Sequence, residues 1–263
     1  MQQDPSGSWV SADGQWRWDG RSWVPNSAVT QSAPANLSFG DVISMPTRDP
    51  RWFGKCGIEG LIGLIPIYGT FEVAGWALSY LDNLRAGRAA LPEARFGYAG
   101  RGSRLALVGL IYSLVAVVLF YLVFFGVFFL LAGTAPQQSR CGTPDCPTTP
   151  SPFPAFLFAS LFAFQGLFLL VYAALHFIVL PIAFRTEQGG VGAGLNLVAA
   201  IKSAAQDPKT AAAGAALVFI AWFISSLGTY ACLVGVVFSY GYAAAMFGAA
   251  VRWYEQRRLE AAA

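Results

Sequence analysis

The chain has 263 residues, of which 56% are hydrophobic and only 12% are charged, and its mean hydropathy is +0.52. This balance is far more apolar than that of a soluble domain, so it excludes an ordinary soluble enzyme and predicts an integral membrane protein. The net charge of +3 is small, and four scattered cysteines are too few for a disulfide framework or a four-ligand zinc site. Fourteen arginines against three lysines, in an alanine-rich chain, indicate a bacterial genome.

Residues 1–26 contain four tryptophans around two Asp-Gly pairs. Asp-Gly between aromatic residues predicts tight hairpins, because glycine supplies the positive φ that the turn requires. We expect three very short strands, at Trp9-Val10, Gln15 to Trp18 and Ser22 to Pro25. A sheet this small is only marginally stable alone in water, so it should need a partner or the membrane interface to be ordered. It is therefore either a docking module or a tail that seeks the membrane interface. The candidate docking residues are Trp9, Trp16, Trp18 and Trp23.

A linker over residues 27–47 leads to an apolar segment, residues 52–84, that is interrupted at Pro66 and Gly69. Basic residues flank this segment on both sides, and the positive-inside rule keeps both flanks cytoplasmic. The charges therefore favour a re-entrant or interfacial helical hairpin, because broken backbone at membrane depth is tolerated where protein buries it. One tilted span is the alternative, since about 20 residues cross the hydrocarbon core.

The rest of the chain alternates apolar runs with basic loops. Four runs are long enough to cross the bilayer, the last two joined by a tight turn at residues 226–229: 105–131, 153–184, 211–227 and 230–251. The loop before residue 208 holds an amphipathic helix at 191–205, and Asp207-Pro208 is a typical helix start. After residue 84 the proposed cytoplasmic loops hold eleven basic residues and the outside loop holds one.

The predicted fold is therefore an all-α, multi-pass bundle in the plasma membrane, with about four full transmembrane helices plus the broken hairpin and with both termini cytoplasmic. Its domains would be a Trp-rich segment, a linker, a membrane domain and a short tail: 1–26, 27–47, 48–256 and 257–263. The expected partners are the lipid bilayer and a protein bound by the Trp-rich segment. Nucleic acid is not an expected partner, and a homo-oligomer is compatible with this fold.

Residues 62–93 carry four short motifs, which are Ile-Pro-Ile, Gly-Trp-Ala-Leu, Arg-Ala-Gly and Leu-Pro-Glu. On these motifs the chain, over about residues 50–256, resembles the domain of unknown function 4013 family of prokaryotic membrane proteins. The resemblance implies a helical membrane fold and brings no biochemistry with it. The N-terminal segment lies outside it and is similar to the W-D-G-x-x-W pieces at the cytoplasmic ends of many bacterial membrane proteins.

Three ionisable residues in apolar segments are candidate site residues, because a charge at the centre of a membrane helix costs about 2.5 to 3.5 kcal/mol. Glu59 and Glu72 flank the Pro66 break, and a hairpin would bring them to a similar depth, where they could bind a cation or carry protons. The alternative is that both hydrogen-bond to water or to backbone. His176, the only histidine, is either a proton relay or a structural contact to a neighbouring helix.

Cys141 and Cys146 are separated by the turn-forming Gly-Thr-Pro-Asp in the outside loop, where we expect a disulfide. No motif for a metal, a cofactor or catalysis occurs. The leading hypothesis is a non-catalytic membrane anchor or organiser whose cytoplasmic segments bind partners or anionic lipid. The alternative is a small-solute or ion transporter component that uses Glu59 and Glu72. A membrane-embedded enzyme is the third hypothesis.

Overall fold

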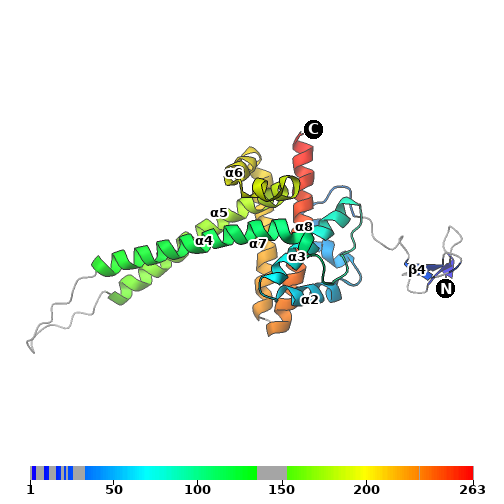
Figure 1. Ribbon diagram of the computed structural model, residues 1–263, viewed down its shortest axis with the longest axis horizontal. Coiled ribbons are helices and arrows are strands. Elements are labelled where there is room, and N and C mark those ends of the chain that lie inside the picture. The colour runs from blue at the N-terminus through cyan, green and yellow to red at the C-terminus, as the bar shows by residue number, and fades with distance from the viewer. Residues whose placement is uncertain are drawn as a thin grey trace, which may run out of the picture.

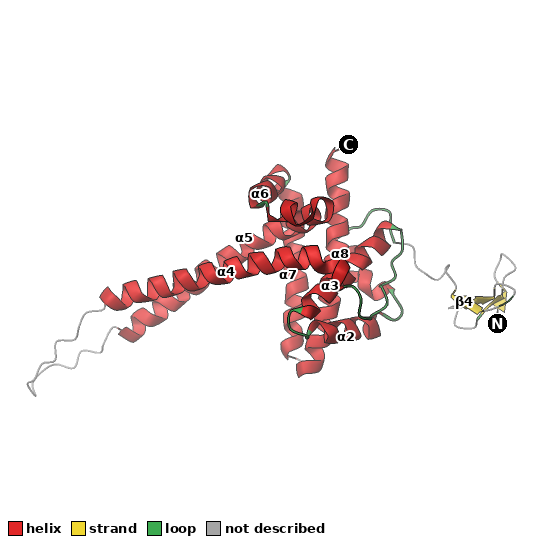
Figure 2. Ribbon diagram, in the orientation of Figure 1, coloured by secondary structure: helices red, strands yellow, loops and turns green. Residues whose placement is uncertain are grey.

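Helices make up most of the described residues in the computed structural model (Figure 1, Figure 2). The structure describes residues 2–3, 9–11, 16–18, 21, 23–25, 33–134, 153–230 and 232–262. The helical elements are α1 Phe39–Ser44, the 3₁₀ helix η1 Met45–Arg48, α2 Trp52–Gly63, α3 Tyr68–Arg85, α4 Ala99–Thr134, α5 Phe153–Leu195, α6 Leu197–Gln206, α7 Pro208–Tyr230 and α8 Cys232–Ala262. The predicted all-α body is therefore present.

A small antiparallel sheet precedes the helices. Its strands run in the order β1 Gln2–Gln3, β2 Trp9–Val10, β3 Trp16–Trp18 and β4 Trp23–Pro25. Trp18 pairs with Trp23 across the last two strands, and their rings meet edge to face with centroids 5.7 Å apart. Strands β2 to β4 fall where the sequence places short strands, whereas β1 was not expected. Within the described residues the sheet makes no contact with any helix, and Figure 1 shows it apart from the helical body.

The hydrophobic core lies where α3 packs on α8, with α2 and α7 on either side. Trp76 and Tyr80 of α3 and Met246 of α8 are fully buried there. Glycines let the helices approach until their backbones touch. A Cβ on Gly60 of α2 would lie 1.7 Å from the carbonyl oxygen of Val237 on α8. Such close approach through small residues is typical of helix packing in membranes, where burial of apolar surface gives little driving force.

The break between α2 and α3 is a tight turn at Ile67, whose φ is 64° and ψ is −62°. The amide of Tyr68 donates to the carbonyl of Pro66 at 2.7 Å across it. This is the geometry of a γ-turn, which reverses the chain in three residues but is strained for a residue other than glycine. Gly69 then passes against the Ile62 carbonyl, where a Cβ would come within 2.5 Å. The segment is thus a helical hairpin, as the sequence predicts; its depth in a membrane stays a prediction.

Two pairs of helices extend from this body. Helices α4 and α5 form a long arm, and α7 and α8 form a second pair that runs in a different direction in Figure 1. In the part of the chain that the structure describes, two helices are long and apolar enough to cross a membrane, at Ala99–Gly126 and Pro208–Tyr230. These two helices support a helical membrane protein, and the count of four full spans stays a prediction.

Two helix ends differ from the expected ones. Helix α5 continues past Arg185 to Leu195, with a kink at Gly190, whose φ is 73°, so the predicted loop is mostly helical. Helix α7 continues through the expected turn at 226–229, because the hydroxyls there bond to carbonyls of their own helix rather than ending it. Thr229 donates to the Ser226 carbonyl at 2.6 Å. The Asp207-Pro208 start of α7 is as expected, with Asp207 accepting from the Thr210 amide at 3.1 Å.

Candidate functional site

Glu72 lies on α3 with its side chain fully buried. Its carboxylate accepts hydrogen bonds from the Tyr68 hydroxyl at 2.5 Å and from the amides of Tyr98 at 2.7 Å and Gly97 at 3.2 Å. These amides lead directly into α4, and a helix N-terminus favours a negative charge because its first N–H groups have no partner within the helix. Glu72 therefore links the start of α4 to α3. This is hydrogen bonding to backbone, which the sequence left open as the alternative to a cation or proton site.

Glu59 is in the opposite situation. Its side chain is also fully buried, on α2, but neither carboxylate oxygen has a hydrogen-bond partner among the described residues. The glycines beside it, Gly57 and Gly60, pack directly on α8. An ionised carboxylate without donors is strongly disfavoured in such a place, so the neutral acid is the form that fits. The two glutamates that the sequence treats as a pair are thus not equivalent.

A buried ion pair lies where α2 begins. The Lys55 Nζ is 2.9 Å from the Asp49 carboxylate, and the two side chains are 8% and 4% exposed. Lys55 also donates to the Leu91 carbonyl at 2.7 Å, and the Leu91 amide donates to Asp49 at 2.9 Å. The pair ties the start of α2 to the segment between α3 and α4. Sequence reasoning used Lys55 only as a marker of the membrane face and missed Asp49, which no motif singles out.

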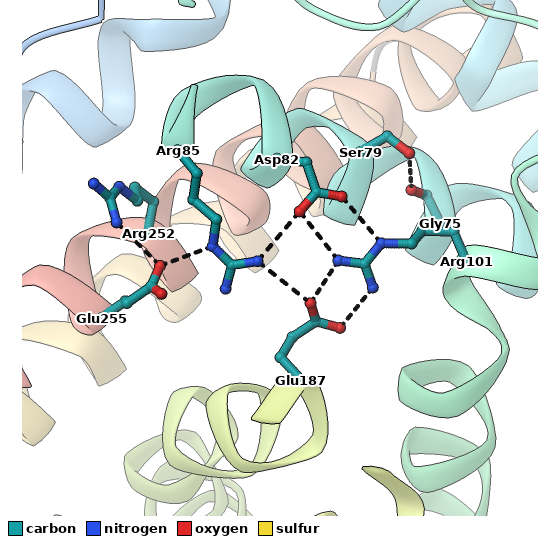
Figure 3. Close-up of polar contacts among 8 residues, drawn as sticks. All are labelled: Gly75, Ser79, Asp82, Arg85, Arg101, Glu187, Arg252 and Glu255. Carbon is teal, nitrogen blue, oxygen red and sulfur yellow. Dashed lines mark hydrogen bonds and ion pairs between the residues drawn. The ribbon is translucent and has the colours of Figure 1, made fainter. Parts of the chain in front are cut away.

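The largest polar cluster centres on Arg101, near the start of α4 (Figure 3). Its guanidinium donates two bonds to Glu187 of α5, at 2.8 and 2.6 Å, and two to Asp82 of α3, at 3.1 and 3.2 Å. The Glu187 side chain is only 8% exposed. A bidentate arginine–carboxylate pair has strong directional preference, so it fixes the angle at which α4 and α5 meet.

Arg85 extends the same cluster from α3 to α8. It lies 3.2 Å from Asp82 and 3.0 Å from Glu255, and Glu255 also accepts from Arg252 at 3.2 Å. Figure 3 shows the resulting chain of alternating charges, in which three arginines face three carboxylates. The network joins α3, α4, α5 and α8, and its ionic charges balance. Sequence analysis counted these arginines as topology signals and did not identify their acidic partners, because the partners are far apart in sequence.

No family model matches the chain, and neither does any curated protein or any solved structure. The resemblance to the domain of unknown function 4013 family therefore stays a prediction.

His176 of α5 is 7% exposed and its Nδ1 lies 2.7 Å from the carbonyl oxygen of Tyr172, one turn earlier. The ring also packs edge to face on Tyr172, and it contacts Phe219 of α7 at a centroid distance of 6.2 Å. Nδ1 is thus the donor to its own helix, while the contact with α7 is one of ring packing. A relay role for His176 stays a prediction.

The tryptophan candidates differ in exposure. Trp9, Trp16 and Trp18 are 48%, 44% and 36% exposed, whereas Trp23 is half-buried against Trp18. Cys141 and Cys146 lie outside the described residues, so their disulfide stays a prediction. In the described ranges no group of three His, Cys, Asp or Glu side chains is placed to hold a metal ion.

Proposed function

We propose that the chain is a non-catalytic membrane anchor or organiser that displays its N-terminal sheet to a protein partner in the cytoplasm. The observation that carries this proposal is the set of exposed tryptophans on the sheet: Trp9, Trp16 and Trp18. Exposed tryptophan is costly in water and is enriched at protein interfaces, where a rigid ring supplies large contact area at small entropic cost.

We further propose that all four long helices, α4, α5, α7 and α8, enter the plasma membrane, which makes the protein multi-pass with cytoplasmic termini. The exposed apolar surface of α4 supports this, because Leu114, Leu122 and Phe129 are each more than 60% exposed and need a non-aqueous environment. The excess of basic residues in the proposed cytoplasmic loops supports the orientation. Helices α2 and α3 would then form the re-entrant or interfacial hairpin.

Helix α6 supports a second contact with the membrane. Leu197, Val198 and Ile201 are 41%, 77% and 50% exposed on this short helix, and Lys202 is exposed beside them. Apolar residues flanked by lysine are typical of helices that lie in the headgroup region of an anionic bilayer. We propose that α6 rests on the cytoplasmic leaflet.

The test of the docking role is site-specific photo-crosslinking in intact cells. A photoreactive amino acid replaces Trp9, and the matched control carries it at Val198 of α6. We expect a discrete protein adduct from position 9 that disappears when Trp16 and Trp18 are both replaced by serine, with membrane fractionation unchanged. Adducts to lipid alone at position 9 would contradict the docking role and support an interface-seeking tail.

Transport of a small solute or ion is the second candidate, and one observation favours it: Glu59 is buried and has no hydrogen-bond partner among the residues that the structure describes. Interrupted helices such as α2 and α3 form binding sites in transporters. Deleting residues 1–32 separates the two candidates. Loss of the cellular phenotype on that deletion supports docking, whereas an intact phenotype that is sensitive to Glu59→Gln supports transport.

A further inference from the structure

Glu59 occupies a closed three-helix junction. On the α8 side, a Cβ on Gly57 would meet the Phe238 ring at 2.5 Å, and one on Gly60 would meet the Val237 carbonyl at 1.7 Å. Also on α8, a Cβ on Gly241 would come within 2.0 Å of the Cys56 carbonyl, whereas on the α3 side a Cβ on Gly63 would come within 2.9 Å of the Val73 side chain. Helix α2 is therefore pressed against α8 along more than one turn on both sides of the glutamate. The carboxyl cannot be hydrated while this contact stays closed.

We propose that Glu59 is a proton-binding site that controls the packing of α2 against α8. With the proton bound, the neutral carboxyl fits the closed junction. Release of the proton requires α2 to separate from α8 and admit water. The O–H bond then breaks, its electron pair stays on the carboxylate oxygen, and water accepts the proton. The carboxylate has no donor in the closed junction, so the ionised form holds α2 apart from α8.

The titratable groups around Glu59 reinforce this behaviour. From α3, Glu72 acts on it with a negative charge that opposes a second one nearby. On its own helix Cys56 and Lys55 precede it by about one turn, and the charge of Lys55 is paired with Asp49 at 2.9 Å. From α8, Tyr240 packs on Gly63, and α8 carries no charged residue between Cys232 and Val251. No cation is within ion-pair distance of Glu59 among the described residues, so nothing there would stabilise its ionised form.

A proton fits this site better than a metal cation does. Sodium, calcium or magnesium ions require several oxygen ligands, and in the described ranges no group of three His, Cys, Asp or Glu side chains is placed to hold a metal ion. A proton requires no coordination shell. This inference does not depend on docking by the N-terminal sheet, and it would hold whether the protein anchors a partner or moves a solute.

The first experiment is infrared spectroscopy of the full chain in lipid vesicles. We expect a carbonyl stretch from a protonated carboxyl at pH 7 that is lost in Glu59→Gln and retained in the control Glu93→Gln, whose side chain is 61% exposed. The exposed Glu93 carboxylate pairs with Arg51 at 2.7 Å, so its removal should leave the band unchanged. Absence of the band in the wild-type protein would overturn the proposal.

The second experiment follows the opening itself by hydrogen exchange of α2 amides, corrected for the intrinsic pH dependence of exchange. Opening coupled to release of one proton increases the opening constant tenfold for each pH unit above the transition. We expect that slope in the wild-type protein and a flat profile in Glu59→Gln, whose amide stays neutral and of similar shape. A flat wild-type profile would show that α2 does not open with pH and would overturn the proposal. Closure of α2 at high pH by sodium but not by potassium would also overturn it, because Glu59 would then bind a cation rather than a proton.

Discussion

Replacing Glu187 by glutamine tests whether the ionic network holds the helices together. The substitution keeps the shape of the side chain but removes the charge that receives two hydrogen bonds from Arg101, at 2.8 and 2.6 Å. Hydrogen bonds to charged groups contribute about 1.5 to 3 kcal/mol, and leaving a buried charge uncompensated costs about 3 to 5 kcal/mol. Arg101 is 36% exposed and keeps Asp82 as a partner, so the larger figure does not apply.

We therefore expect Glu187→Gln to lower the free energy of unfolding by about 2 kcal/mol, which is roughly a 30-fold change in the unfolding equilibrium. The matched control is Glu260→Gln. Glu260 pairs with Arg257 one turn earlier on α8 at 2.9 Å, but both side chains are more than 40% exposed. Surface pairs of that kind contribute about 0 to 0.5 kcal/mol, so the control should be nearly neutral.

The measurement is reversible unfolding of the full chain in mixed micelles with increasing denaturing detergent, followed by far-ultraviolet circular dichroism. A double-mutant cycle with Arg101→Gln isolates the pairwise energy between the two side chains. Equal effects of Glu187→Gln and Glu260→Gln, or a coupling energy near zero between Arg101 and Glu187, would refute the view that this network fixes α4 to α5.

Three further predictions follow from single contacts. Gly60→Ala places a methyl group 1.7 Å from the Val237 carbonyl oxygen, so it should destabilise the fold by more than the about 1 to 3 kcal/mol that is usual for overpacking. The control is Gly54→Ala, where a Cβ has nothing within 4 Å. In the same unfolding assay it should be neutral or stabilise α2 by up to about 1 kcal/mol. Glu72→Gln should lose about 1 to 2 kcal/mol and raise amide exchange at the start of α4, since charged acceptors bind backbone N–H groups more strongly; unchanged exchange there would argue against the clamp. Hydrogen bonds from the Ser38 hydroxyl and amide lower the pKa of Asp41. The stabilisation of the α1 cap should therefore be complete above about pH 4 and be lost as the pH falls through the lowered pKa. Hydrogen exchange of the α1 amides should show that loss in the wild-type protein but not in Asp41→Asn.

Local features of the fold are readable from sequence because they depend on neighbouring residues. The γ-turn at Ile67 follows Pro66, and the start of α7 follows from Asp207-Pro208. The end of α7 was misplaced because Ser226 and Thr229 can either end a helix or bond back to its carbonyls, and only the packed chain selects the second. Helix ends are therefore less well determined by sequence than helix centres.

Sequence also singled out Glu59 and Glu72 as unusual residues, since a carboxyl in an apolar segment is costly. It could not distinguish them. Glu72 has partners because the chain between α3 and α4 folds back on α3, so that the amides of Gly97 and Tyr98, 25 and 26 positions later, donate to its carboxylate. Among the described residues Glu59 has no hydrogen-bond partner, although Gly57 and Gly60 on either side of it pack on α8, far along the chain.

Sequence alone predicts a helical membrane protein, the approximate positions of its apolar helices and the loops that carry the basic residues. Those properties are sums over short windows of residues, so no knowledge of contacts is required. The packing of the helices selects which charges neutralise one another and leaves Glu59 without a hydrogen-bond partner in the part of the chain that the structure describes. Asp82, Arg101, Glu187 and Glu255 come from four different helices, and their meeting depends on how those helices pack.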